Sequence, residues 1–374
     1  MGSPEVRNLR SFPPGQRATP SARALLALFL LAGIWPESAH AQERIREVAE
    51  SKRGEVKAPT KAAPKQSKPS SRKKRLVFQP LASSRQALVP FKSAPFPYTG
   101  LVPVTGKPFL DVQIEGRYGR FSARTGQVYW ADETYNDARV LLDLPQGFNA
   151  GRAGVLIVFL HGNGATLARD VIQRQHVPKQ IAAARLNSAL IAPQLAVDAL
   201  DSSAGKFWEP GAFAAFLDEA TTQLARLLGD ARAKLPLDAM PVVVVAYSGG
   251  YLPLAYLLQH GGATERIIGV VVLDGLYGEP ERFAAWIDAR RDAYFVGAYG
   301  RSSSDGTTEL ARLLGERNVP FSTTLGQALE PGDIVLFQVP DTVVHADFVT
   351  KAWTDQPLRD LLRRMQAFPR QSKP

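Results

Sequence analysis

The 374-residue sequence contains no cysteine, so disulfide bonds cannot contribute to its stability. The fold must depend on its hydrophobic core, which a chain of this length can build as one large or two ordinary domains. Histidine is also scarce, with five in the whole chain, and no cluster of His and carboxylate residues has the spacing of zinc ligands. The sequence also lacks an internal repeat. We therefore expect neither a metal nor another cofactor.

The formal net charge of +10 is concentrated near the N-terminus. Residues 1–86 hold 17 Lys and Arg against 6 Asp and Glu, whereas residues 87–374 hold 28 positive and 29 negative side chains. The folded part is thus close to neutral and gives no reason to expect nucleic-acid binding.

Residues 24–36 (ALLALFLLAGIWP) form an uncharged run that four arginines precede. The run is too short to span a bilayer but has the length of a signal-peptide core. Small residues at Ala39 and Ala41 predict cleavage before Gln42. We therefore expect residues 1–41 to be a signal peptide and the mature chain, without a transmembrane span, to be periplasmic or secreted. The alternative is a short membrane anchor that stays uncleaved.

Residues 42–88 are predicted to form a disordered basic linker. Their central part, EVKAPTKAAPKQSKPSSRKKR at 55–75, is rich in Lys, Pro, Ala and Ser and has almost no large apolar residue. Such a segment cannot bury enough surface to offset the entropy lost on ordering. We interpret it as a spacer, with electrostatic contact to an anionic cell envelope as a secondary role. The folded domain then covers residues 89–374.

From about Pro90, short apolar runs alternate with stretches of helical periodicity. This alternation predicts right-handed crossovers and a mostly parallel sheet. A leading antiparallel pair is expected from residues 118–129 and 139–144. The further predicted strands are residues 155–160, 188–193, 242–245, 267–273, 294–299 and 333–339, and the predicted helices are 166–185, 211–228, 251–259 and 280–290.

The segment PVVVVAYSGGYLP at 241–253 contains a serine between a strand and a helix. Its four valines are typical of a strand buried on both faces, and helical apolar spacing follows the two glycines. A sharp strand-to-helix turn with Ser248 at its apex is the context of a nucleophile elbow. Ala246 and Gly250 supply the small side chains that let strand and helix approach closely. The alternative is a glycine-rich turn that packs tightly and has no chemical role.

A second glycine-rich turn, His161-Gly162-Asn163-Gly164, follows the strand predicted at 155–160. With the elbow and the strand pattern, it resembles the α/β-hydrolase fold over roughly residues 90–368. The resemblance implies an eight-stranded, mostly parallel sheet with helices on both faces. It also implies that Ser248 is the nucleophile and that two backbone amides form an oxyanion hole, one from Asn163 or Gly164 and one from Gly249.

The resemblance places the catalytic histidine after the last strand, where His345 is the histidine available. The acid has two candidates. Asp274 ends the strand after the nucleophile strand, whereas Asp305 follows the next strand, the commoner position in the family. We favour Asp274 because it lies directly at the end of a buried strand, while Asp305 lies in a Ser/Gly-rich loop that is typical of a solvated turn.

Three aromatic residues are candidates for contact with substrate: Tyr247 beside the serine, Trp208 in the long loop at 192–213, and Tyr277. For Trp208 the alternative is a structural role that fixes this loop to the body. The segment between Asp274 and the next strand is short, which predicts the absence of a large lid. An open site fits small or polymer-end substrates better than a buried lipid chain.

These features predict an exported serine hydrolase that cleaves a carboxylic ester or amide through an acyl-enzyme. The elbow and the segment LDGLYG at 273–278 are similar to those of exported bacterial α/β-hydrolases with unassigned substrates. One alternative is a peptidase or amidase acting on cell-wall material. Another is a non-catalytic envelope-binding protein with the same fold.

Overall fold

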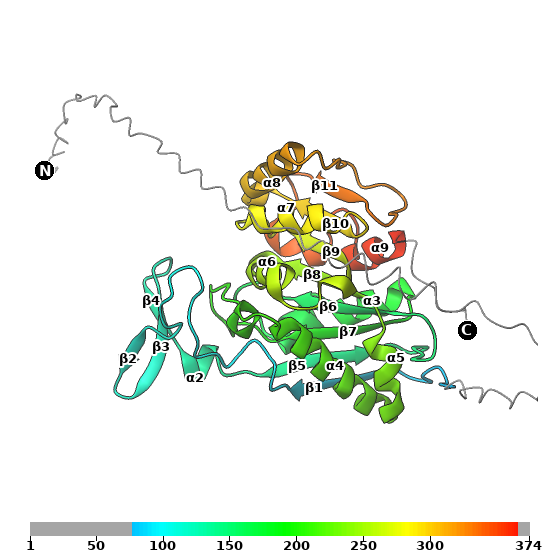
Figure 1. The fold of residues 1–374 in the computed structure, drawn as a ribbon, viewed down its shortest axis with the longest axis horizontal. Helices are drawn as coiled ribbons and strands as arrows, with labels where there is room; N and C mark the ends of the chain where they lie inside the picture. The colour runs from blue at the N-terminus through cyan, green and yellow to red at the C-terminus, as the bar shows by residue number, and fades with distance from the viewer. Residues whose placement is uncertain (1–76, 366–374) are drawn as a thin grey trace, which may run out of the picture. The chain divides into compact units, whose positions relative to one another are not determined.

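The computed structural model describes residues 77–365 and contains an eight-stranded sheet between two layers of helices (Figure 1). The predicted signal peptide and most of the predicted linker lie outside the described residues. The strand order is β1-β5-β7-β6-β8-β9-β10-β11; β5 is antiparallel to both neighbours and all other pairs are parallel. The mostly parallel sheet is thereby confirmed. Its strands are β1 (Arg85–Pro90), β5 (Arg139–Leu144), β6 (Val155–Leu160), β7 (Ser188–Pro193), β8 (Val242–Tyr247), β9 (Ile267–Leu273), β10 (Tyr294–Tyr299) and β11 (Ile334–Gln338).

The leading antiparallel pair differs from the prediction. It is formed by β1 and β5, in which Arg85 pairs with Leu144 and Pro90 with Arg139. Residues 85–88 therefore belong to the sheet, and the predicted linker extended too far. The strand was missed because β1 lies at the edge of the sheet, where half-exposed and exposed positions alternate and no apolar run develops.

Two helical layers cover the sheet, and successive residues of each strand point to opposite layers. In β8, Val242, Val244 and Ala246 face one core, and Val243, Val245 and Tyr247 face the other. The first core is covered by α4 (Ala212–Leu228), α5 (Lys234–Asp238), α6 (Tyr251–His260), α7 (Pro280–Ala289) and α8 (Ser304–Glu316). The second is covered by the π-helix η1 (Leu167–Arg174), α3 (Val177–Ala184) and α9 (Pro357–Arg364).

The predicted helix at 166–185 is divided into η1 and α3. His176 separates them with a left-handed backbone (φ 52°), a conformation that ends regular helical hydrogen bonding. Short helical turns complete the secondary structure: η2 (Gly205–Trp208), η3 (Ala231–Ala233), η4 (Ser248–Gly250), η5 (Thr264–Arg266), η6 (Arg301–Ser303) and η7 (His345–Val349).

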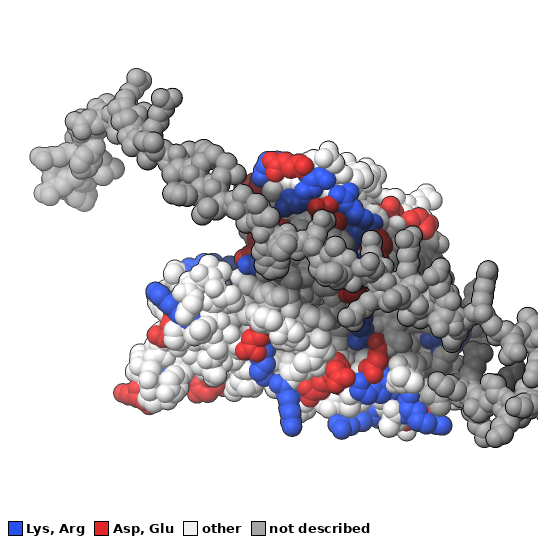
Figure 2. Space-filling model, viewed as in Figure 1, with Lys and Arg blue, Asp and Glu red and all other residues white. Residues whose placement is uncertain are grey.

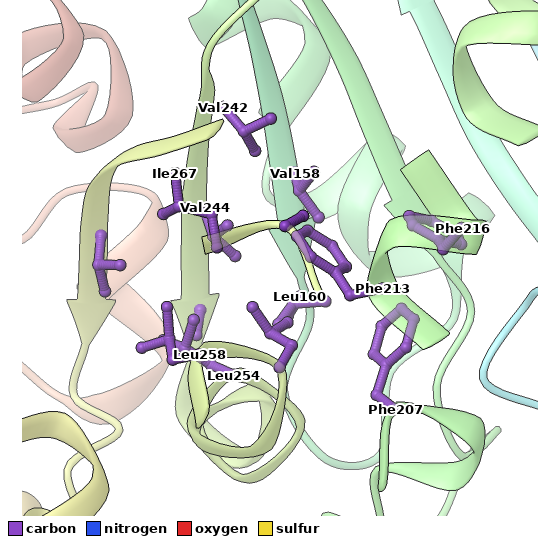
Figure 3. Packing of buried hydrophobic residues seen from close by; sticks show 14 of the residues in the cluster. Val158, Leu160, Phe207, Phe213, Phe216, Val242, Val244, Leu254, Leu258 and Ile267 are labelled. Atoms are coloured by element: carbon purple, nitrogen blue, oxygen red, sulfur yellow. The ribbon is translucent and has the colours of Figure 1, made fainter. Parts of the chain in front are cut away.

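The core beneath the nucleophile strand is aliphatic and aromatic. Figure 3 shows Val242 and Val244 of β8 beside Val158 and Leu160 of β6, with side chains from α4 and α6 packed over them. Those covering side chains are fully or almost fully buried: Phe213, Phe216, Leu254 and Leu258. Close packing on both faces holds the carboxyl end of β8 in a fixed position.

A separate three-stranded antiparallel sheet is inserted between β1 and β5 (Figure 1, cyan). It consists of β2 (Val112–Ile114), β3 (Arg117–Ser122) and β4 (Gln127–Trp130), and the short helix α2 (Ala131–Thr134) follows it. The Arg124 guanidinium in its β3–β4 turn donates to the Leu200 carbonyl (2.9 Å), and the Leu200 amide donates to the Tyr129 hydroxyl (3.2 Å). The inserted sheet therefore supports the loop at 192–213.

Charges of both signs are interspersed on the face shown in Figure 2. Around α4 and α5, the Lys234 ammonium lies 2.8 Å from Asp218 and 2.7 Å from Asp238. The described residues visible on this face form no extended patch of one sign, in agreement with the near-neutral charge of residues 87–374. Among residues 77–365, no helix has both the length and the apolar character that crossing a membrane would require.

Candidate active site

Ser248 lies at the end of β8, at the point where the strand turns into η4 and α6. Its backbone is left-handed (φ 53°), which is uncommon and strained for a residue with a side chain. A Cβ atom at Gly250 would lie 2.5 Å from the Leu160 carbonyl oxygen, so this position accepts only glycine without rearrangement. Ala246, which is fully buried, provides the other small side chain. The geometry is that of the predicted elbow.

Ser248, His345 and Asp274 form a continuous chain of hydrogen bonds. The His345 Nε2 atom lies 2.8 Å from Ser248 Oγ, and His345 Nδ1 lies 2.6 Å from Asp274 Oδ2. Since the carboxylate accepts the Nδ1 proton, Nε2 is left as the acceptor for the serine hydroxyl. The structure therefore brings the three predicted residues together, and Ser248, His345 and Asp274 are called the triad below.

Asp274 is 1% exposed and accepts hydrogen bonds on both carboxylate oxygens. Besides His345, its donors are the Gly300 amide (3.0 Å) and the hydroxyls of Ser302 (2.6 Å) and Ser303 (2.5 Å). Burial alone would raise the pKa of Asp274, but these hydrogen bonds outweigh it and lower the pKa to about 2. The carboxylate is thus ionised throughout the neutral range.

The other candidate acid, Asp305, is exposed in the first turn of α8. Its carboxylate lies 3.4 Å from the Ser304 hydroxyl, and His345 contacts Asp274 instead. The loop after β10 thus supplies hydroxyl donors to the acid. No sequence signal marked this role, because the serines at 302 and 303 follow a strand as an ordinary polar turn does.

Tyr247 holds the segment that carries His345. Its hydroxyl donates to the His345 carbonyl oxygen (3.0 Å), and the two rings stack with centroids 5.1 Å apart. The Tyr247 side chain is 5% exposed, and burial raises its pKa. The structure thus places Tyr247 against the histidine loop, and its predicted contact with substrate stays a prediction.

The turn at 161–164 lies against the elbow. A Cβ atom at Gly162 would lie 2.8 Å from Ser248 Cβ, so only glycine permits this approach. The Gly164 amide donates to the Ala199 carbonyl (2.8 Å), which removes Gly164 from the predicted oxyanion donors. Among the hydrogen bonds of residues 77–365, none uses the Asn163 amide. Gly249 lies in the first turn of a helical segment, where amides have no intrahelical acceptor. Asn163 and Gly249 therefore remain as the candidate pair.

His161 fixes this turn from within the core. Its Nδ1–H donates to the Gly162 carbonyl (2.8 Å), and its Nε2 accepts from the Leu195 amide (2.9 Å) and contacts the Gln194 side-chain nitrogen (2.9 Å). Burial lowers the pKa of His161, which keeps the ring neutral in this arrangement. The imidazole thereby joins the turn to the end of β7.

Trp208 lies in the core and not at a substrate surface. It is 5% exposed, and its ring packs edge-on against Tyr98 (5.7 Å) and Phe109 (5.6 Å). Its carbonyl oxygen accepts from His260 Nε2 at 2.8 Å. This environment matches the structural alternative, in which Trp208 fixes the loop to the body.

Tyr277 is the predicted aromatic contact that does lie at the triad. Its side chain is 40% exposed, its hydroxyl lies 3.4 Å from His345 Nδ1, and its ring is edge-on to Tyr251 (5.8 Å). Burial raises the pKa of Tyr277 to about 12, so the hydroxyl keeps its proton at neutral pH. No group of three or more His, Asp or Glu side chains that could hold a metal ion occurs within residues 77–365.

This strand order, with the serine after β8, the aspartate after β9 and the histidine after β11, is that of the α/β-hydrolase fold. No family model and no curated protein sequence matches it. Similar solved structures include a mutant feruloyl esterase module from Clostridium thermocellum complexed with sinapinate (11% identity, 77% of this chain and 94% of that chain, TM-score 0.40). Another is a poly(3-hydroxybutyrate) depolymerase from Bordetella parapertussis (14% identity, 62% of this chain and 85% of that chain, TM-score 0.35). A third is a bacterial brefeldin A esterase (16% identity, 75% of this chain and 75% of that chain, TM-score 0.36). At these identities and TM-scores, the similarities give no information about the substrate of this chain.

Proposed function

We propose that the protein is a serine hydrolase that cleaves a carboxylic ester or amide through an acyl-enzyme. His345 Nε2 takes the proton of Ser248 as Oγ attacks the acyl carbon, and the amides of Asn163 and Gly249 stabilise the oxyanion. The imidazolium then gives this proton to the leaving group. Water, activated by the same histidine, releases the acid and restores the serine.

The observation that carries this proposal is the hydrogen-bonded chain from Asp274 through His345 to Ser248. A buried, ionised carboxylate fixes the imidazole tautomer that can accept a proton from serine, and it stabilises the imidazolium that results. The convergence of the three side chains argues against a non-catalytic binding protein, which has no need for a serine on a strained turn next to a histidine.

Labelling with a fluorophosphonate probe tests the proposal directly. We expect the native protein to be labelled once per chain, and the Ser248→Ala and His345→Ala variants to lose labelling. Ser84→Ala is a matched control, because Ser84 is exposed and remote from the triad in the sequence. Absence of label on the native protein, or equal label on Ser248→Ala, would refute the proposal.

The choice between ester and amide requires a substrate panel. The same triad acts on both, so p-nitrophenyl esters and peptide anilides should be compared at equal concentrations of labelled active sites. Preference for the anilides would favour the peptidase or amidase alternative, including action on cell-wall material.

Export is a further part of the proposal and depends on residues 1–41. Expression of the full chain in a bacterial host, followed by N-terminal sequencing of the mature protein, should give a chain that begins at Gln42. Retention of the first residue would indicate an uncleaved anchor. Release of the mature protein from envelopes by salt would indicate that the basic linker binds an anionic surface.

A further inference from the structure

The two sides of Ser248 are supplied by different strands. The sheet order places β6 on one side of β8 and β9 on the other. The turn that contains Asn163 follows β6, and the segment from Asp274 to Tyr277 follows β9. The candidate oxyanion donors and Tyr277 therefore approach the serine from opposite sides.

A substrate bound with its carbonyl oxygen toward Asn163 and Gly249 must direct its leaving group away from them. The leaving group takes its proton from His345 Nε2, so it lies on the histidine side of Ser248. The Tyr277 hydroxyl lies beside the same histidine, 3.4 Å from His345 Nδ1, and comes from the segment that follows β9.

The Tyr277 hydroxyl is not committed to a strong hydrogen bond with the triad. The Nδ1 proton of His345 goes to Asp274 at 2.6 Å, so the 3.4 Å contact to Tyr277 is too long to compete for it. Ser302 and Ser248 are further polar neighbours, and the Ser302 hydroxyl donates to Asp274 at 2.6 Å. The proton of Tyr277 is thus free to be donated to a substrate.

The ring of Tyr277 is positioned by its surroundings. Its amide donates to the Gly275 carbonyl (2.9 Å), and Tyr251 packs against the ring edge-on. A Cβ atom at Gly275 would lie 2.9 Å from the Ser248 carbonyl oxygen, which shows how closely this segment follows the elbow. With 40% of its side chain exposed, Tyr277 is also accessible to a substrate.

We propose that the Tyr277 hydroxyl donates a hydrogen bond to the leaving-group atom of the substrate. When the tetrahedral intermediate collapses, the bond between the acyl carbon and this atom breaks, and the electron pair stays on the leaving atom. That atom receives the proton of the His345 imidazolium. Tyr277 keeps its own proton and stabilises the negative charge that develops before the transfer is complete. The inference rests on the proposed function and assigns it a specificity-determining residue.

The test compares Tyr277→Phe with the wild-type protein on two esters of the same acid, one of p-nitrophenol and one of a simple alkyl alcohol. The alkyl alkoxide is a poor leaving group and needs the donor, whereas p-nitrophenolate leaves readily without it. We expect kcat/KM for the alkyl ester to fall roughly tenfold more than kcat/KM for the p-nitrophenyl ester, as the loss of one hydrogen bond in the transition state implies.

Tyr251→Phe is the matched control, since Tyr251 packs against the same ring and has no polar contact with the triad among the described residues. Tyr251→Phe should change kcat/KM for the two esters by the same factor. If Tyr277→Phe lowers kcat/KM equally for the two esters, or lowers neither, the inference is overturned. Active-site counting with the fluorophosphonate probe corrects for misfolded protein. A wild-type protein that is neither labelled nor active on either ester would overturn the proposed function, and this inference with it.

Discussion

The buried carboxylate of Asp274 should make a measurable, pH-dependent contribution to stability. A pKa of about 2 in the folded state, against an ordinary value of 3.8, means that the native protein binds a proton on this group less readily than the unfolded chain. At about 1.4 kcal/mol per unit of pKa difference, the shift corresponds to roughly 2 kcal/mol of unfolding free energy at neutral pH. This contribution is present above the unfolded pKa and is lost as the pH falls through the folded one.

Asp274→Asn removes this titration and retains the shape of the side chain. We expect the variant to be less stable than the wild type at neutral pH, and the difference to shrink by roughly 2 kcal/mol between about pH 5 and pH 2. Urea unfolding at a series of pH values, followed by tryptophan fluorescence, gives both free energies. Activity should fall strongly as well, because an amide can hold the wrong imidazole tautomer.

Asp305→Asn is the control, since it also removes one carboxylate but from an exposed position in the first turn of α8. Its stability difference from the wild type should show no comparable change in the same pH range. The reasoning is refuted if the difference between wild type and Asp274→Asn stays constant with pH, because the hydrogen bonds around Asp274 would then not favour its ionised form.

Two further substitutions test the parts of the site that position the triad. Tyr247→Phe keeps the ring that stacks on His345 but removes the hydroxyl that donates to the His345 carbonyl. We expect the free energy of unfolding, measured in urea, to fall by about 1 kcal/mol. In ester hydrolysis we expect a several-fold lower kcat with little change in KM. An unchanged kcat would contradict that role. Gly162→Ala places a methyl group 2.8 Å from Ser248 Cβ and should cost about 1–3 kcal/mol while slowing fluorophosphonate labelling. Labelling at the wild-type rate would show that the turn can move away from the elbow without effect.

The parts of the fold that the sequence predicted are those with strong local signals. β6, β8 and β9 are continuous apolar runs because both of their faces are buried, and parallel strands of this kind carry their functional residues at one shared edge. Ser248, Asp274 and His345 could therefore be proposed from their positions after strands together with the resemblance to α/β-hydrolases, without knowledge of any contact.

The features that the sequence missed depend on contacts between distant residues. For Trp208 the sequence left substrate contact and a structural role open, because the Tyr98 and Phe109 rings that pack against it lie about a hundred residues earlier. The three-stranded sheet was missed because its strands are short and largely exposed, so they lack a clear apolar alternation. The choice between Asn163 and Gly164 depended on one hydrogen bond, from Gly164 to Ala199.

The placement of the acid after β9 has a consequence for the order in which the site is assembled. Ser248 and Asp274 follow two strands that pair directly, with Tyr247 opposite Leu273, so nucleophile and acid are brought together by a short-range pairing. His345 lies 71 residues beyond Asp274 and must wait for β11 to pair with β10 and for its own loop to dock. A chain synthesised from its N-terminus therefore acquires two members of the triad early and the third late. Hydrolytic activity should therefore appear only when the segment that carries His345 has docked, after most of the sheet has formed.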